Sequence, residues 1–132
     1  MADRSFCAVP HMIGVRVRMV TVRATLNASA NGTIVSNPGN LVASIVHDAA
    51  GKYVITFTDL YRKPLLMLPH YGIVEGQAVD LYASTSVQPT TVSGVMVAQV
   101  QLKTGAANTD PPASPNGGEL QLLFIFEDSD AL

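Results

Sequence analysis

The chain has 132 residues, of which 48% are hydrophobic and only 14% are charged. This length fits one domain that can bury a core of its own. A typical soluble domain carries about 25% charged residues, so the low charge density indicates that a partner covers part of the surface. The formal net charge of −2 argues against a dedicated nucleic-acid binder, which normally presents a strongly basic face.

Charge is distributed unevenly along the chain. The first part contains one acidic residue, Asp3, against several arginines, and the part from Asp110 onward contains no Lys or Arg. A basic start and an acidic end favour head-to-tail attraction between neighbouring copies, although solvated tails show the same pattern. The residues concerned are Arg4, Arg16, Arg18 and Arg23 near the start, and Glu119, Glu127, Asp128 and Asp130 near the end.

A single cysteine, Cys7, limits the covalent chemistry of the chain. It allows no internal disulfide and no cysteine-based zinc site. The start of the chain lacks the apolar run of a signal peptide, and no stretch approaches the roughly 18 consecutive apolar residues of a membrane span. We therefore expect a protein that is made in the cytoplasm and has no membrane partner.

The first predicted element is a long strand over residues 15–26. Val15, Val17 and Met19 alternate with arginines, and the apolar phase then moves by one residue to Val20 and Val22. Such a slip inside one strand is typical of a β-bulge, so we expect a bulge near residue 19. An Asn-Gly turn signal lies in the loop that follows.

Short β-branched and apolar runs, separated by Gly, Pro, Asn and Asp, predict the further strands. Period-2 alternation is clearest at Tyr53, Ile55 and Phe57. No window long enough for a helix shows helical periodicity. The predicted strands after the first lie at residues 33–36, 41–47, 53–58, 65–68, 77–83, 91–103 and 119–127.

The last predicted strand is apolar on both faces. Leu120, Leu122 and Phe124 lie on one face, and Leu123 and Ile125 lie on the other. Strands of this kind are typical of sheets covered on both sides, so we expect both faces to be buried.

A Pro- and Gly-rich loop at residues 104–118 interrupts the closing hairpin. Loops longer than about 12 residues with little apolar content are usually functional or disordered, so we expect this loop to project and to be mobile or bound by a partner. About eight short strands with turn-rich connections predict an all-β, single-domain β-sandwich or jelly roll. In this division, residues 1–12 form an N-terminal arm and residues 13–132 form the sandwich domain.

Candidate catalytic and metal-binding groups are few and widely spaced. His11, His47 and His70 lie on three different segments, and no pair has the spacing of a zinc motif. The sequence contains no nucleophile elbow, no phosphate-binding loop and no dinucleotide fingerprint. We therefore predict that the chain is not an enzyme and holds no cofactor and no metal.

Candidate partner-binding residues gather near the start of the chain. The apolar side chains of Phe6, Val9 and Met12 would let the arm reach across a subunit joint and bury apolar surface there. Arginines at the start of the first strand would contact acidic protein surface, or would form the solvated side of that strand. These arginines are Arg16, Arg18 and Arg23.

The segment at residues 46–59, Val-His-Asp-Ala-Ala-Gly-Lys-Tyr-Val-Ile-Thr-Phe-Thr-Asp, resembles a pattern of small tailed-phage virion proteins. In that pattern a Gly-x-Tyr-x-x-x-Phe strand follows a tight turn and leads into an apolar strand, here residues 65–68. The closing stretch, residues 120–130, is similar to the way such proteins end, with a strand and then an acidic tail. The resemblance covers residues 41–130 and implies a jelly-roll capsid decoration protein, also called a cement protein.

The resemblance implies a structural virion protein that binds and stabilises a bacteriophage capsid shell. Its partners would be the major capsid protein or another virion protein, together with copies of itself as a dimer or trimer. It would lie on the capsid surface after synthesis in the host cytoplasm. The alternative hypothesis is a receptor- or carbohydrate-binding tip or tail module of a virion. Four tyrosines could line a sugar-binding cleft, but they are scattered and Trp is absent, so packing in the core and in turns is the favoured interpretation. They are Tyr53, Tyr61, Tyr71 and Tyr82.

Overall fold

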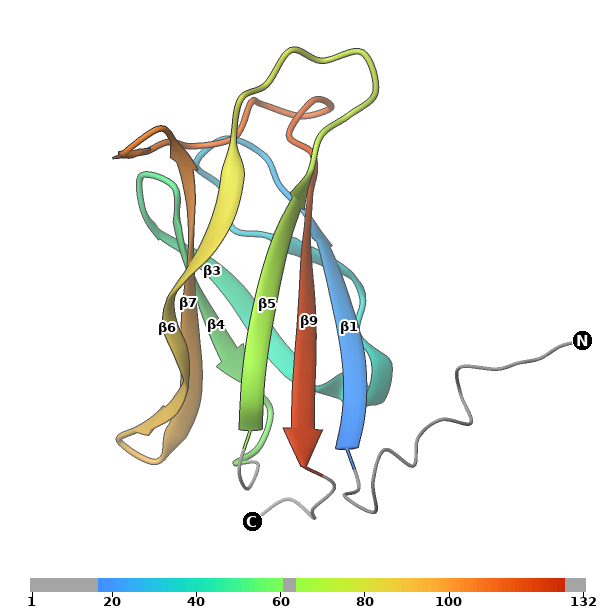
Figure 1. Cartoon of the computed structure of the whole chain (residues 1–132), viewed down its shortest axis with the longest axis vertical. Coiled ribbons are helices and arrows are strands. Elements are labelled where there is room, and N and C mark those ends of the chain that lie inside the picture. Colours follow the sequence, from blue (N-terminus) through green and yellow to red (C-terminus); the bar gives the residue numbers. More distant parts are fainter. Residues whose placement is uncertain (1–16, 61–63, 128–132) are drawn as a thin grey trace, which may run out of the picture.

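The computed structural model describes residues 17–60 and 64–127, which form two antiparallel sheets packed face to face (Figure 1). Sheet A has the strand order β2–β1–β9–β5, and sheet B has the order β3–β4–β7–β6, with β8 paired to β7. The predicted all-β sandwich is confirmed. Its elements are β1 (Val17–Thr25), β2 (Thr33–Ser36), the 3-10 turn η2 (Pro38–Asn40), β3 (Val42–Ala49), β4 (Lys52–Phe57), β5 (Pro64–Gly72), β6 (Tyr82–Val92), β7 (Val95–Thr104), β8 (Ala107–Asn108) and β9 (Glu119–Glu127).

Alternate residues of the two sheets point inward and form one apolar core. The ring of Phe57 from sheet B meets that of Phe124 from sheet A edge to face, with 5.2 Å between centroids. No polar or charged residue is buried in the part of the chain that the structure describes. Full burial of one large apolar side chain contributes about 1.5–3 kcal/mol, so this core is the main source of stability.

Strand β1 is regular where the sequence predicted a bulge. It pairs with β9 in one unbroken register over its whole length. Val22 and Ala24 are buried, whereas Met19 is 63% exposed. The prediction of a bulge near residue 19 is wrong because the two apolar phases lie on opposite faces of one strand. The register shift in β1 occurs against β2, between Arg23 and Ala24.

Strands β6 and β7 form a hairpin that the sequence prediction divided wrongly. In place of strands at residues 77–83 and 91–103, the two strands meet at a two-residue turn made by Ser93 and Gly94. Both turn residues have positive φ, 52° and 81°, as a type I′ hairpin turn requires. The Ser-Gly pair is a turn signal, but the Val and Thr residues on either side of it suggest a continuous strand.

A side chain of β6 closes the edge of sheet A at β5. The Met67 N–H donates to Oε1 of Gln88 at 2.9 Å, and Nε2 of Gln88 donates to the Met67 carbonyl at 3.3 Å. The Thr85 hydroxyl donates to the same carbonyl at 3.3 Å. The Gln88 amide therefore takes the place of a neighbouring strand at this point, where an open edge would invite pairing with another chain.

The long loop between β8 and β9 is part of the fold, so the prediction that it projects is wrong. Pro111 is buried, and hydrogen bonds attach the loop to the turn after β1 and to β5. A Cβ at Gly117 would overlap the carbonyl of Leu26, so only glycine allows this close approach. The hydrogen bonds are Leu26 N–H to Gly118 O at 3.1 Å, Ala28 N–H to Pro112 O at 3.1 Å, Ser114 N–H to Asn27 Oδ1 at 2.8 Å, and Tyr71 hydroxyl to Gly117 O at 2.9 Å.

Candidate protein-binding surface

Strands β1, β9 and β5 lie side by side in sheet A (Figure 1). Their outer face carries a group of apolar side chains. The strand register places Met19, Ile125 and Leu66 in one row, and Leu123 and Leu68 in the next. Met19 is 63% exposed and Leu68 is 46% exposed, while the other three are partly buried by their neighbours. We call these five side chains the apolar patch.

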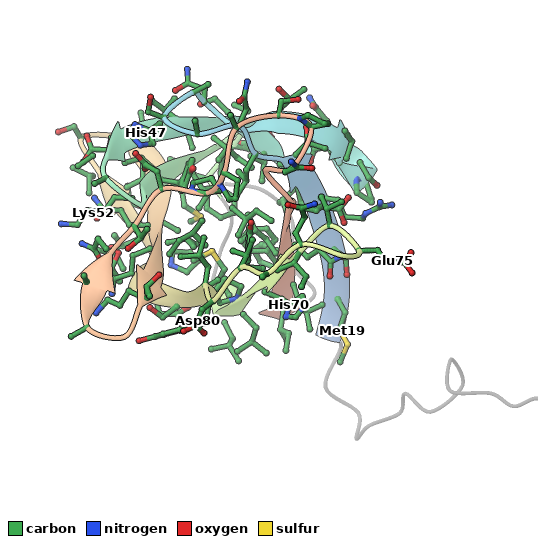
Figure 2. All side chains as sticks on the ribbon, turned by 90° about the horizontal axis from the view of Figure 1, so that it is seen from above. Met19, His47, Lys52, His70, Glu75 and Asp80 are labelled. Carbon is green, nitrogen blue, oxygen red and sulfur yellow. The ribbon has the colours of Figure 1, made fainter. Side chains whose placement is uncertain are left out.

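No element within residues 17–60 and 64–127 covers the apolar patch. The prediction that both faces of β9 are buried is therefore wrong for this part of the chain, because Leu123 and Ile125 keep contact with solvent. Figure 2 shows Met19 and His70 on this side of the molecule, away from His47. Contiguous apolar surface of this kind usually marks an interaction site.

The same outer face is polar toward the loop end of the sandwich. Nε and Nη2 of Arg23 donate to the two carboxylate oxygens of Glu119 at 3.0 and 2.8 Å, and Gln121 donates to Oε1 at 2.8 Å. The hydrogen bond from Arg23 holds the pKa of Glu119 below its ordinary value, and the same bond raises the pKa of Arg23. The face thus has one apolar end and one charged end.

The outer face of sheet B has a different character. Each of its central rows contains at least one polar side chain, so apolar groups do not adjoin one another across three strands. Val46, at 40% exposure, lies opposite Val54 and has polar neighbours in the rows on both sides. These rows are Ser44–Thr56–Val97, Val46–Val54–Gln99 and Lys52–Gln101.

Arg23 is the one predicted partner-binding residue whose side chain the structure describes. It is paired with Glu119 inside the chain, and its side chain is 51% exposed. Arg23 therefore stabilises the charged end of the outer face and has only part of its surface left for a partner. Arg18 occupies a backbone position of β1 opposite Phe126. The other candidates, Phe6, Val9, Met12 and Arg16, lie outside the described residues.

His47 and Asp110 join the long loop to the turn between β3 and β4. Nε2 of His47 lies 2.8 Å from Oδ1 of Asp110, which also accepts the Gly51 N–H at 2.7 Å. Burial opposes ionisation of Asp110, but these two hydrogen bonds outweigh it and hold the pKa of the carboxyl below its ordinary value. Among the described residues, no three His, Cys, Asp or Glu side chains gather as a metal site would require.

A shallow cleft of about 450 Å³ lies beside the long loop and the segment after β5, and no tyrosine lines it. Tyr53 and Tyr71 are buried, which raises the pKa of each phenol. Tyr82 donates to the Gly105 carbonyl at 2.6 Å. Tyr53 and Tyr71 are therefore not available for the aromatic cleft that a carbohydrate-binding module needs, whereas Tyr82 is 48% exposed and stands alone among the exposed tyrosines that the structure describes. Tyr61 lies outside the described residues.

The sequence prediction missed the apolar patch as a functional surface. It took Leu123 and Ile125 as buried residues and placed Met19 in a bulged strand. A signal was available in the sequence, because apolar residues occupy successive positions of these strands and therefore both faces. Leu66 and Leu68, for example, lie on the face opposite to the buried Met67. When three adjacent strands carry apolar residues on both faces, the outer face of their sheet is expected to bind another surface in addition to the core.

Comparison with known proteins found no matching family model, no matching curated protein and no matching solved structure. In the described part of the chain, no helix has the length and apolar character needed to cross a membrane. The function therefore has to be inferred from the fold and its surfaces.

Proposed function

We propose that the chain is a non-catalytic structural protein of a virion, which decorates a phage capsid shell and is held in that assembly at the apolar patch. The observation that carries this proposal is the row formed by Met19, Ile125 and Leu66, which runs unbroken across three strands of one outer face. Burial of apolar surface stabilises association by about 25 cal/mol per Å² before ordering costs. Such a row therefore favours a protein partner.

The rigidity of the sandwich supports the same function. The patch lies on paired strands, β5 is fixed to β6 through Gln88, and the loop end is closed by hydrogen bonds. A surface that is already ordered loses little conformational entropy on binding. A protein that stabilises a shell needs such a preformed surface.

The resemblance of residues 46–59 to small phage virion proteins supports the capsid shell as the place of assembly. In the structure this segment is the β3–β4 hairpin, with Gly51 at φ 64° in its turn and Tyr53 and Phe57 in the core. The Arg23–Glu119 pair at the charged end of the outer face would fix orientation more than affinity, because exposed charges mainly guide encounter and register.

Co-sedimentation of purified protein with phage particles tests this proposal. We expect Leu68→Glu to weaken attachment at least about tenfold, since loss of a central hot-spot contact costs about 2 kcal/mol or more and about 1.4 kcal/mol corresponds to tenfold. The matched control is Val46→Glu, which places the same charge at a similarly exposed position on sheet B. Equal attachment of both variants, or no attachment by the wild-type chain, contradicts the proposal.

A further inference from the structure

We propose that the apolar patch of one copy receives residues 6–12 of a second copy, so that neighbouring copies join head to tail. This inference rests on the proposed function, since it names the partner of the same surface. It is carried by the size of the patch, by the place where β1 begins, and by the charges at the two ends of the sequence.

The patch is narrow. Three adjacent strands span about 10 Å from first to last, and two successive rows on one face lie about 7 Å apart. A stable interface between two folded surfaces buries about 800 Å² on each partner, which needs a wider apolar area than five side chains provide. A short extended segment fits this surface better than a second sheet does.

The chain contains one segment of suitable composition close to this surface in sequence. Phe6, Val9 and Met12 are apolar residues within seven positions, and β1 begins at Val17. Val17 pairs with Glu127, two positions along β9 from the row that contains Ile125. The segment therefore joins the fold at the apolar end of the outer face of sheet A.

The direction of β1 favours a second copy over the same chain. Val17 lies opposite Glu127 at the end of sheet A, and β1 runs from there toward the loop end of the sandwich, so residues 6–12 precede the sheet in the direction that leads away from its own face. An extended chain covers up to about 3.5 Å per residue. The residues from Phe6 to Val17 could thus span nearly 40 Å, which is enough to reach a neighbouring domain.

Charge is complementary between the two elements that would meet. Arginines stand on both sides of residues 6–12, at Arg4 and Arg16, whereas acidic residues follow Ile125 in the sequence. Contact between such groups sets the register of the segment, and the buried apolar side chains supply most of the affinity. The acidic residues are Glu127, Asp128 and Asp130.

Cys7, the single cysteine, lies inside the proposed segment and allows a direct test. A nitroxide is attached to Cys7 of a chain without isotopes, which is mixed with an isotope-labelled Cys7→Ser chain. We expect the nitroxide to broaden the methyl signals of Leu68 and Ile125 in the labelled chain, and to leave those of Val46 and Val97 sharp. The proposal is overturned if no broadening occurs or if all four residues broaden equally. It is also overturned if broadening occurs only when the nitroxide and the isotopes are on the same chain.

Sedimentation velocity of the purified chain gives the second readout, which no nitroxide perturbs. We expect removal of residues 1–12 and the change Leu68→Glu each to weaken self-association at least about tenfold, while Val46→Glu associates like the wild-type chain. A wild-type chain that is monomeric at every concentration, or variants that associate as it does, overturns the proposal. This experiment contains no particles, so a negative result overturns the self-association of the chain without deciding whether the chain binds to a capsid.

Discussion

Composition suggests the wrong role for two regions of the molecule, the long loop and the outer face of sheet A. Residues 104–118 are rich in Pro and Gly and resemble a free, partner-binding loop, yet they close one end of the sandwich through hydrogen bonds. Strand β9 is apolar on both faces and resembles a strand buried on both sides, yet one of its faces has no cover among the described residues. Composition alone therefore does not separate fold from interface.

The physical reason lies in which atoms make the contacts. The loop is held largely through its own backbone, by the carbonyls of Pro112, Gly117 and Gly118 and the N–H of Ser114, so its anchoring leaves little mark in the hydropathy pattern. The apolar patch is made by side chains, which do appear in the pattern but show only that some surface must cover them. The four predictions below separate the two regions, from the largest expected effect to the smallest.

Replacement of residues 109–117 with Asn-Gly should abolish cooperative folding or lower the free energy of unfolding by about 4 kcal/mol or more. The change removes several hydrogen bonds, each worth about 1 kcal/mol, and uncovers the end of the core. Urea denaturation followed by circular dichroism measures the effect. As a control, Asn-Gly in place of Gly105 and Ala106, at the exposed β7–β8 turn, should leave the midpoint unchanged. An unchanged midpoint for the loop replacement would show that the loop is dispensable.

Gly117→Ala should lower the free energy of unfolding by about 3 kcal/mol, because the new Cβ meets the Leu26 carbonyl and forces the backbone apart. Gly76→Ala is the matched control. Gly76 has a φ of 85° with open space around it, so alanine there costs only about 1–2 kcal/mol of backbone strain. Equal losses for the two variants would mean that the loop does not approach β1 closely.

Asp110→Asn should lower the free energy of unfolding by about 1 kcal/mol at neutral pH, through weaker hydrogen bonds to Gly51 and His47. The folded-state pKa of Asp110 is lowered, so its stabilisation is complete above the unfolded value of about 3.9 and is lost as pH falls through the folded value. The difference between variant and wild type should therefore close below about pH 4.

Urea denaturation across pH measures this difference, with Asp48→Asn, at an exposed position of β3, as the control. A difference that persists undiminished into strong acid would show that the carboxylate charge plays no part in anchoring the loop.

Leu68→Glu should change the free energy of unfolding by no more than about 0.5 kcal/mol, as exposed substitutions usually do. At the adjacent position, Met67→Ala should cost about 2–5 kcal/mol because Met67 is completely buried. Thermal or urea unfolding of both variants gives the contrast. A large loss of stability in Leu68→Glu would mean that the apolar patch belongs to the folding core.

The sequence predicts the sheets better than it predicts the surfaces. Alternation at Tyr53, Ile55 and Phe57 locates β4 and its buried face, and the flanking turn signals locate β2 and β9 within the chain. The turn at Ser93 and Gly94 is not predicted, because strand-forming residues on both sides make it look like part of a strand. Burial of alternate residues is a local property, whereas a turn inside such a run depends on the partner strand.

The sequence predicts that a partner-binding surface exists, but it does not predict where that surface lies. Low charge density indicates a covered surface, but the position of that surface depends on register, which brings Met19, Ile125 and Leu66 together from three distant segments. No pattern within a single segment contains this information. Arg23 illustrates the same point, since its pairing with Glu119 joins residues that are 96 positions apart and leaves less of its surface for a partner.

The methionines allow a direct test of whether the outer face of sheet A is covered in the native assembly. Met19 is 63% exposed in the isolated fold, whereas Met67 and Met96 are 0% and 4% exposed. Intact particles are treated briefly with peroxide, and mass spectrometry gives the rate of sulfoxide formation at each position. We expect Met19 on the particle to oxidise as slowly as Met67. Oxidation of Met19 many times faster than that of Met67, while the chain remains attached, would contradict the account.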